Sequence, residues 1–183
     1  MKKNVLFWIA VHNKDPHINQ KHGDFKYFEY SRNTWESWCK KNDVIFYHYN
    51  EPTLDDIVTY KPTWQRWFDV FKQLEENNIE YNKICVVDSS TMIRWDSPNF
   101  FDLCPDGELT AFRSLENLRW INESSQGYKN LFGGFDIDLT KYINCGVQIF
   151  DKEHKKFLDK LIKFYNENYD EIQRLQNEVV KKG

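Results

Sequence analysis

The feature of this sequence that most constrains the fold is a set of short, nearly continuous apolar runs. Residues 4–11 read NVLFWIAV, and residues 84–87 read ICVV just before the acid Asp88. A strand that is apolar at every position, rather than at alternate ones, is typical of a sheet covered on both faces. The longest run is far below the roughly 20 apolar residues needed to span a bilayer. These runs therefore predict buried strands.

Segments of helical periodicity separate the strands. One helix is expected over 27–41, and a second begins at Pro62-Thr63 with an apolar face that we expect to be core: Trp64, Trp67, Phe68, Phe71 and Leu74. Further strands are expected at 44–49, 83–88, 108–113 and 142–150, and an amphipathic segment at 152–180. Such alternation predicts an α/β fold with a mainly parallel, Rossmann-like sheet flanked by helices. Residues 114–140 are too polar and glycine-rich to assign.

Length and composition limit the domain count and the partners. With 183 residues the chain can bury one substantial core, so we expect a single domain over 1–183. The 25 Lys and Arg against 28 Asp and Glu leave a net charge of -3, which argues against a nucleic-acid partner. The four cysteines form no CxxC pair, so reduced thiols are expected. The start MKKNVLFWIAVH lacks a signal-peptide cleavage site, which favours a cytoplasmic protein without a membrane span.

The acid Asp88 is the first candidate functional residue. Ligands of open α/β sheets bind outside the carboxyl ends of the strands, which is where Asp88 should lie. There its carboxylate could hold a divalent cation or a ribose hydroxyl, or it could simply cap the turn that follows. GxxxxGK[ST] and GxGxxG do not occur, and AVHNKDPH after the first strand contains no glycine. P-loop, dinucleotide-fold and nucleotidyltransferase functions therefore lose their main support.

Two ordered motifs carry a resemblance to a known family. The first is VVDSSTMI followed by PNFFDL, and the second is YINCGVQIF. The chain resembles the nucleotide-sugar-dependent glycosyltransferases of the GT-A fold, in particular the glycogenin-like and galactosyltransferase-like family 8. These enzymes carry Asp-x-Asp at the end of an apolar strand, and a later strand with an aromatic, an apolar residue, Asn, a small residue and Gly-Val. PTWQRW at 62–67 occupies the place of a basic residue close to their donor.

The resemblance implies roles for individual residues. Asp88 would contact the donor ribose or a metal ion, and Ser90 stands at the place of the second acid. Asn144 and Gly146 would line the donor-sugar pocket, and Arg66 would lie near the diphosphate or the sugar. The resemblance therefore implies a candidate catalytic pair, Asp88 and Asn144, within a wider donor-binding set.

The resemblance implies two further donor-binding residues, which follow the first strand. His12 and Asn13 would lie by the nucleotide base. Each of the implied positions also has a plain structural interpretation, in which Arg66 is a solvated helix charge, Asn144 a satisfied polar group in a strand and His12 a turn residue.

The sequence departs from the family at the metal site. DSS replaces DxD, and a serine hydroxyl is a much poorer ligand than a carboxylate for Mg²⁺ or Mn²⁺. Any metal site would therefore rest on Asp88, with weak binding that Ser90→Asp strengthens. Without a metal, Arg66 and Lys14 are the candidates for charge stabilisation. The last histidine is His154, and the usual C-terminal acceptor or lid segment is not recognisable.

The resemblance implies a glycosyltransferase of hexosyltransferase type. It would move a sugar from a nucleoside diphosphate sugar, a small-molecule donor, to a glycan or protein acceptor. The alternative is a catalytically silent member of the fold that binds sugar nucleotides or serves in assembly, which Ser90 and the absent C-terminal histidine favour.

Overall fold

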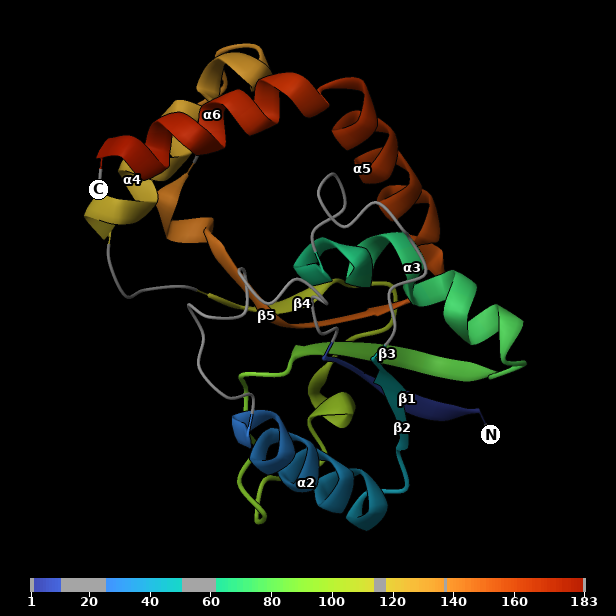
Figure 1. Ribbon diagram of the computed structural model, residues 1–183. Helices are drawn as coiled ribbons and strands as arrows, with labels where there is room; N and C mark the ends of the chain where they lie inside the picture. Colours follow the sequence, from blue (N-terminus) through green and yellow to red (C-terminus); the bar gives the residue numbers. More distant parts are fainter. Residues whose placement is uncertain (1, 11–25, 51–61, 114–117, 137, 183) are drawn as a thin grey trace.

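A computed structural model describes residues 2–10, 26–50, 62–113, 118–136 and 138–182. The described residues form a single five-stranded sheet with helices on both sides (Figure 1). Its strands are β1 (Lys3–Ile9), β2 (Ile45–Tyr49), β3 (Tyr81–Asp88), β4 (Thr110–Arg113) and β5 (Ile143–Asp151). All five lie within the predicted strands to within a few residues.

The sheet is mixed but mainly parallel. Its order is β2-β1-β3-β5-β4, with parallel pairing of β1 to β2 and to β3. The β5 strand pairs antiparallel with both β3 and β4, so four of the five strands run in one direction. The carboxyl ends of those four strands and the amino end of β5 thus meet at one edge. This edge is where an α/β sheet binds its ligands.

Two apolar layers enclose the sheet, which explains the unbroken apolar runs. Side chains alternate across a strand, so successive residues of β1 enter different layers. Leu6 and Trp8 pack with Trp35 and Trp38 of α2 on one face. On the other face, Phe7 belongs to a second layer that includes residues of α3 and α5. The sheet is therefore buried on both sides, as predicted.

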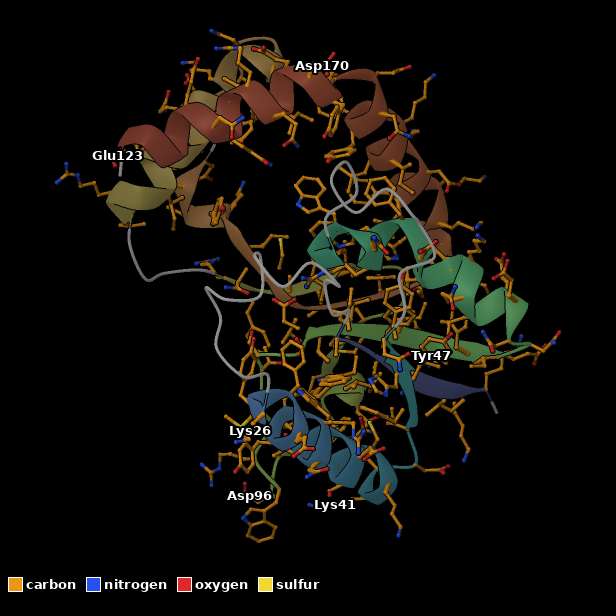
Figure 2. The ribbon with its side chains drawn as sticks, viewed as in Figure 1. Lys26, Lys41, Tyr47, Asp96, Glu123 and Asp170 are labelled. Atoms are coloured by element: carbon orange, nitrogen blue, oxygen red, sulfur yellow. The ribbon has the colours of Figure 1, made fainter. Side chains whose placement is uncertain are left out.

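The longer helices are α2 (Lys26–Lys41), α3 (Pro62–Glu76), α4 (Leu118–Gly127), α5 (Lys155–Glu167) and α6 (Tyr169–Lys182), and short 3₁₀ turns lie at Phe100–Leu103, Lys129–Phe132, Leu139–Lys141 and Lys152–His154. In Figure 1, α2 covers one face of the sheet, α3 and α5 lie on the other, and α4 and α6 extend beyond. Tyr47 points from β2 toward α3 (Figure 2), where its hydroxyl donates to Gln73 over 2.8 Å. None of the helices in the described ranges is long and apolar enough to cross a membrane.

The buried face of α3 differs from the predicted one. Trp64, Trp67 and Phe68 are only half-buried, whereas Gln65 and Asp69 are buried with Val70, Phe71 and Leu74. The reason is that α3 has two neighbours. Trp64 and Phe68 pack on Tyr165 of α5, with ring centroids 4.8 Å and 5.4 Å apart. Because these aromatic side chains pack against α5, the side of α3 that faces the sheet includes the polar residues Gln65 and Asp69.

Two further differences concern the C-terminal half. The predicted amphipathic segment 152–180 is divided at Asn168, whose side-chain amide donates to the carbonyl oxygen of Phe164 over 2.8 Å. The unassigned stretch 114–140 contains helix α4. The hydroxyl of Ser125 in α4 donates a hydrogen bond to the carbonyl oxygen of Ile121. This bond within the helix satisfies one of the polar side chains that made the segment difficult to assign from sequence.

Candidate functional site

The turn after β3 is fixed by hydrogen bonds to Thr91. The backbone N–H and hydroxyl of Thr91 donate to the carbonyl oxygen of Asp88 over 3.0 Å and 2.6 Å. The carbonyl oxygen of Thr91 accepts from the Ser31 hydroxyl (2.5 Å) and from Trp35 Nε1 (3.1 Å), both on α2. The turn is therefore tied to the helix beneath the sheet. Its closure does not use the Asp88 carboxylate, which is 30% exposed and directed elsewhere.

That carboxylate meets a buried guanidinium. Arg66 Nη2 forms an ion pair with Asp88 Oδ1, and the Arg66 side chain is only 3% exposed. Arg66 Nη1 donates to the carbonyl oxygen of Cys145 over 2.9 Å. One arginine of α3 therefore links the ends of two neighbouring strands, β3 and β5. The solvated-charge interpretation of Arg66 is wrong.

Strand register brings Asn144 and Gly146 to the same place. Val87 pairs with Val147, which sets Asp88 opposite Gly146. The Gly146 N–H donates to Asn144 Oδ1 over 2.6 Å. A Cβ on Gly146 would lie 2.8 Å from that oxygen and 3.4 Å from Asp88 Oδ2. Both side chains therefore lie against one glycine, and any larger residue would separate them.

Buried polar contacts hold the start of α3 against the sheet. The Tyr49 hydroxyl lies 2.9 Å from Gln65 Oε1 and 2.8 Å from Asp69 Oδ2. Trp67 Nε1 donates to Gln148 of β5 over 2.8 Å. Burial raises the pKa of the Asp69 carboxyl group, and the hydrogen bond from Tyr49 partly opposes this shift. These contacts fix the helix turn from which Arg66 reaches Asp88.

Cys145 adds a thiol next to this cluster. Of the four cysteines it is the exposed one, and the others are buried. Desolvation of its sulfur raises the pKa of the thiol, with the Arg66 guanidinium opposing and the Asp88 carboxylate adding to the shift. Sequence reasoning did not assign a role to Cys145. Its position between Asn144 and Gly146 was the available signal.

Among the described residues, the side chains around Asp88 offer few ligands to a divalent cation. Within the described ranges, no three His, Cys, Asp or Glu side chains come together as a metal-binding group. His154 lies toward the far end of β5, with its Nδ1 3.0 Å from Asp151. A divalent cation bound to Asp88 would lie roughly 5 Å from Arg66, where an effective dielectric of about 20 gives about 7 kcal/mol of repulsion. The exposed Ser90 offers only a neutral hydroxyl.

The structure thus brings together four of the predicted residues, Arg66, Asp88, Asn144 and Gly146. Ser90 lies two residues beyond Asp88 on the exposed part of the turn. His12, Asn13 and Lys14 lie outside the described residues, so their roles stay predictions.

A large cavity lies elsewhere, between the segment after Thr91 and strands β4 and β5. Its volume is about 720 Å³, and its lining is almost entirely apolar, including Met92, Phe100, Phe112 and Val147. Asp88, Arg66 and Asn144 do not line it. Among the described residues, the one charged side chain in this lining is Arg94, which is paired with Asp96 on the surface. Because the other walls offer a diphosphate no counter-charge, we place the candidate site at the polar cluster.

Comparison with known proteins identifies the fold. No family model and no curated protein sequence matches the chain. Among solved structures, one similar chain is a glycosyltransferase involved in the glycosylation of the major capsid of PBCV-1. The likeness has a TM-score of 0.56 and 12% sequence identity, and it covers 91% of this chain and 68% of the other. It confirms the predicted GT-A-like α/β fold.

Proposed function

We propose that this protein transfers a sugar from a nucleoside diphosphate sugar to a glycan or protein acceptor. The observation that carries the proposal is the ion pair of Arg66 and Asp88, set beside Asn144 at the carboxyl edge of the sheet. That edge is the ligand-binding edge of open α/β sheets. The similarity of the fold to that of a glycosyltransferase supports the same function.

The cluster offers groups for each part of such a donor. The fixed charge of Arg66 suits the diphosphate, which gains negative charge as the bond to the sugar breaks. Asp88 Oδ2 and Asn144 suit hydroxyl groups of the ribose and the sugar, because carboxylate and amide groups hydrogen-bond hydroxyls in fixed directions. Catalysis would then come from positioning and from charge stabilisation of the leaving group. His12 and Asn13 are proposed to hold the base.

The first experiment is a thermal-stability screen with UDP-, GDP-, ADP- and dTDP-sugars. A donor present at about 100 times its dissociation constant adds about 2.7 kcal/mol, or roughly 5–10 °C in melting temperature for a chain of this size. The stabilising donor is then incubated with the protein, and free nucleoside diphosphate is measured with and without glycan and protein acceptors.

Two arginine variants serve as a matched pair. Arg66→Gln should abolish both stabilisation and nucleoside diphosphate release, whereas Arg119→Gln on the exposed surface of α4 should retain both. Stabilisation without release by the wild-type protein would favour the silent sugar-nucleotide-binding module. Stabilisation by none of the donors would refute the proposed function.

A further inference from the structure

Charge balance at the Asp88 site distinguishes this chain from a cation-dependent one. A divalent cation between two carboxylates forms a cluster of zero net charge. The carboxylate of Asp88 and the guanidinium of Arg66 reach the same zero net charge with no cation. The neutral Ser90 leaves that balance unchanged, and a second carboxylate would upset it.

Geometry makes the arginine a permanent part of the site. Its side chain is 3% exposed, so its charge is fixed by the fold instead of being recruited from solvent. The hydrogen bond from Nη1 to the Cys145 carbonyl oxygen holds the guanidinium plane across the ends of β3 and β5. Guanidinium groups are also always protonated at physiological pH. The positive charge is therefore present before any ligand arrives.

The same geometry disfavours a cation. Asp88 Oδ1 accepts from Arg66, and Oδ2 lies against Gly146, 3.4 Å from the place of a Cβ. A cation on either oxygen would have the guanidinium as its neighbour, and the DSS turn offers it only the neutral hydroxyls of Ser89 and Ser90. Mg²⁺ and Mn²⁺ prefer carboxylate and water oxygens to such surroundings.

We infer that this site binds the diphosphate of its donor without a divalent cation, with Arg66 as the fixed positive charge that replaces it. The inference rests on the proposed function. It also specifies which form of the donor binds, namely the one whose diphosphate group carries no metal ion. Replacing Ser90 by Asp should convert the site into one that requires a cation.

The test is calorimetric titration of the nucleoside diphosphate of the stabilising donor, in EDTA and in excess Mg²⁺ or Mn²⁺. For the wild-type protein we expect the tightest binding in EDTA and weaker apparent binding in Mg²⁺ or Mn²⁺, because these cations bind the nucleotide in solution and lower the concentration of its metal-free form. Ser90→Asp should weaken binding by about tenfold or more in EDTA, because the added charge repels the diphosphate, and Mn²⁺ should restore it. Asn122→Asp, which adds the same charge on the exposed surface of α4, should behave like the wild type.

The outcomes distinguish the claim of metal independence from the proposed function on which it rests. Wild-type binding that improves about tenfold or more with Mg²⁺ or Mn²⁺ would overturn metal independence and leave the proposed function standing. Binding in none of the buffers would overturn both. A direct check is the electron paramagnetic resonance signal of free Mn²⁺. The nucleotide alone lowers this signal, and adding the wild-type protein to the nucleotide should not lower it further. This check and the wild-type titrations do not depend on how well Ser90→Asp folds.

Discussion

The guanidinium of Arg66 and the carboxylate of Asp88 form an ion pair that joins α3 to the carboxyl end of β3. Burial of the two partners is unequal, since the arginine is 3% and the aspartate 30% exposed. A buried charge without its partner is costly, whereas an exposed one is hydrated. Removing the aspartate alone should therefore destabilise the fold, and the arginine also supplies positive charge at the candidate site.

The first prediction concerns the energetic coupling of this pair. Asp88→Asn should lower the free energy of unfolding by about 3 kcal/mol, because it takes the carboxylate of Asp88 away from the buried Arg66 charge. In an Arg66→Met background the same replacement should cost much less, which gives a coupling energy of about 2 kcal/mol. Urea unfolding of the four proteins measures it. The exposed pair Arg119 and Glu123 should show no measurable coupling, and equal costs of Asp88→Asn in both backgrounds would contradict the prediction.

The second prediction concerns Gly146. A methyl group there would meet Asn144 Oδ1 at 2.8 Å and displace that side chain, while the strand itself stays paired. Gly146→Ala should therefore weaken nucleotide-sugar binding by about tenfold and change stability by less than about 1 kcal/mol. Asn144→Ala added to this variant should cause little further loss of binding, because the amide is already displaced. Additive losses from the two replacements would show that Gly146 and Asn144 act separately.

Cys145 reports on occupation of the site. Because the pKa of its thiol is raised, alkylation by iodoacetamide should be slow at neutral pH and accelerate as the pH rises. Since Cys145 is the exposed cysteine, mass spectrometry of the native protein should locate the first label there. Saturating nucleoside diphosphate should slow this labelling, because negative charge added beside Asp88 and Arg66 raises the pKa of the thiol further. An unchanged rate would place the nucleotide elsewhere.

A pH dependence of stability follows from Asp69. Burial raises the pKa of its carboxyl group above the ordinary value of 3.8, so the folded state binds this proton more tightly than the unfolded state. The contribution of Asp69 to stability is then greatest below that ordinary value and is lost as the pH rises through the raised pKa. Asp69→Asn should remove this loss, so the stability of the variant relative to the wild type should rise as the pH increases above about 4.

Urea unfolding at a series of pH values measures this difference. Asp159→Asn, at an exposed position of α5, provides a control that should track the wild type across the series. A constant difference between Asp69→Asn and the wild type would mean that the Asp69 proton is not linked to folding.

Sequence patterns predicted the strands of the sheet because burial on both faces leaves an unbroken apolar run, as in 84–87. The place of Asp88 followed from the strand that it ends. The direction of β5 did not follow from the sequence, because an antiparallel central strand is as apolar as a parallel one. That direction decides that the start of β5, with Asn144, lies next to the end of β3.

The polar face of α3 was the least predictable feature. Aromatic residues at helical spacing indicated a core face through Trp64 and Phe68, but these residues pack mainly on α5. Gln65 and Asp69 were not assigned to the core face, and their hydrogen-bond partner Tyr49 lies on β2. Polar groups buried through long-range contacts leave no local periodicity, so only the tertiary structure reveals them.

The location of the donor site is tested most directly by a crystal structure of the protein with the nucleoside diphosphate of its stabilising donor. We predict that the diphosphate lies at the carboxyl end of β3, next to Arg66 and Asn144, with no cation between the phosphates and Asp88. A nucleotide bound instead in the apolar cavity lined by Met92 and Phe112, on the opposite face of the sheet from Arg66, would contradict the proposed site.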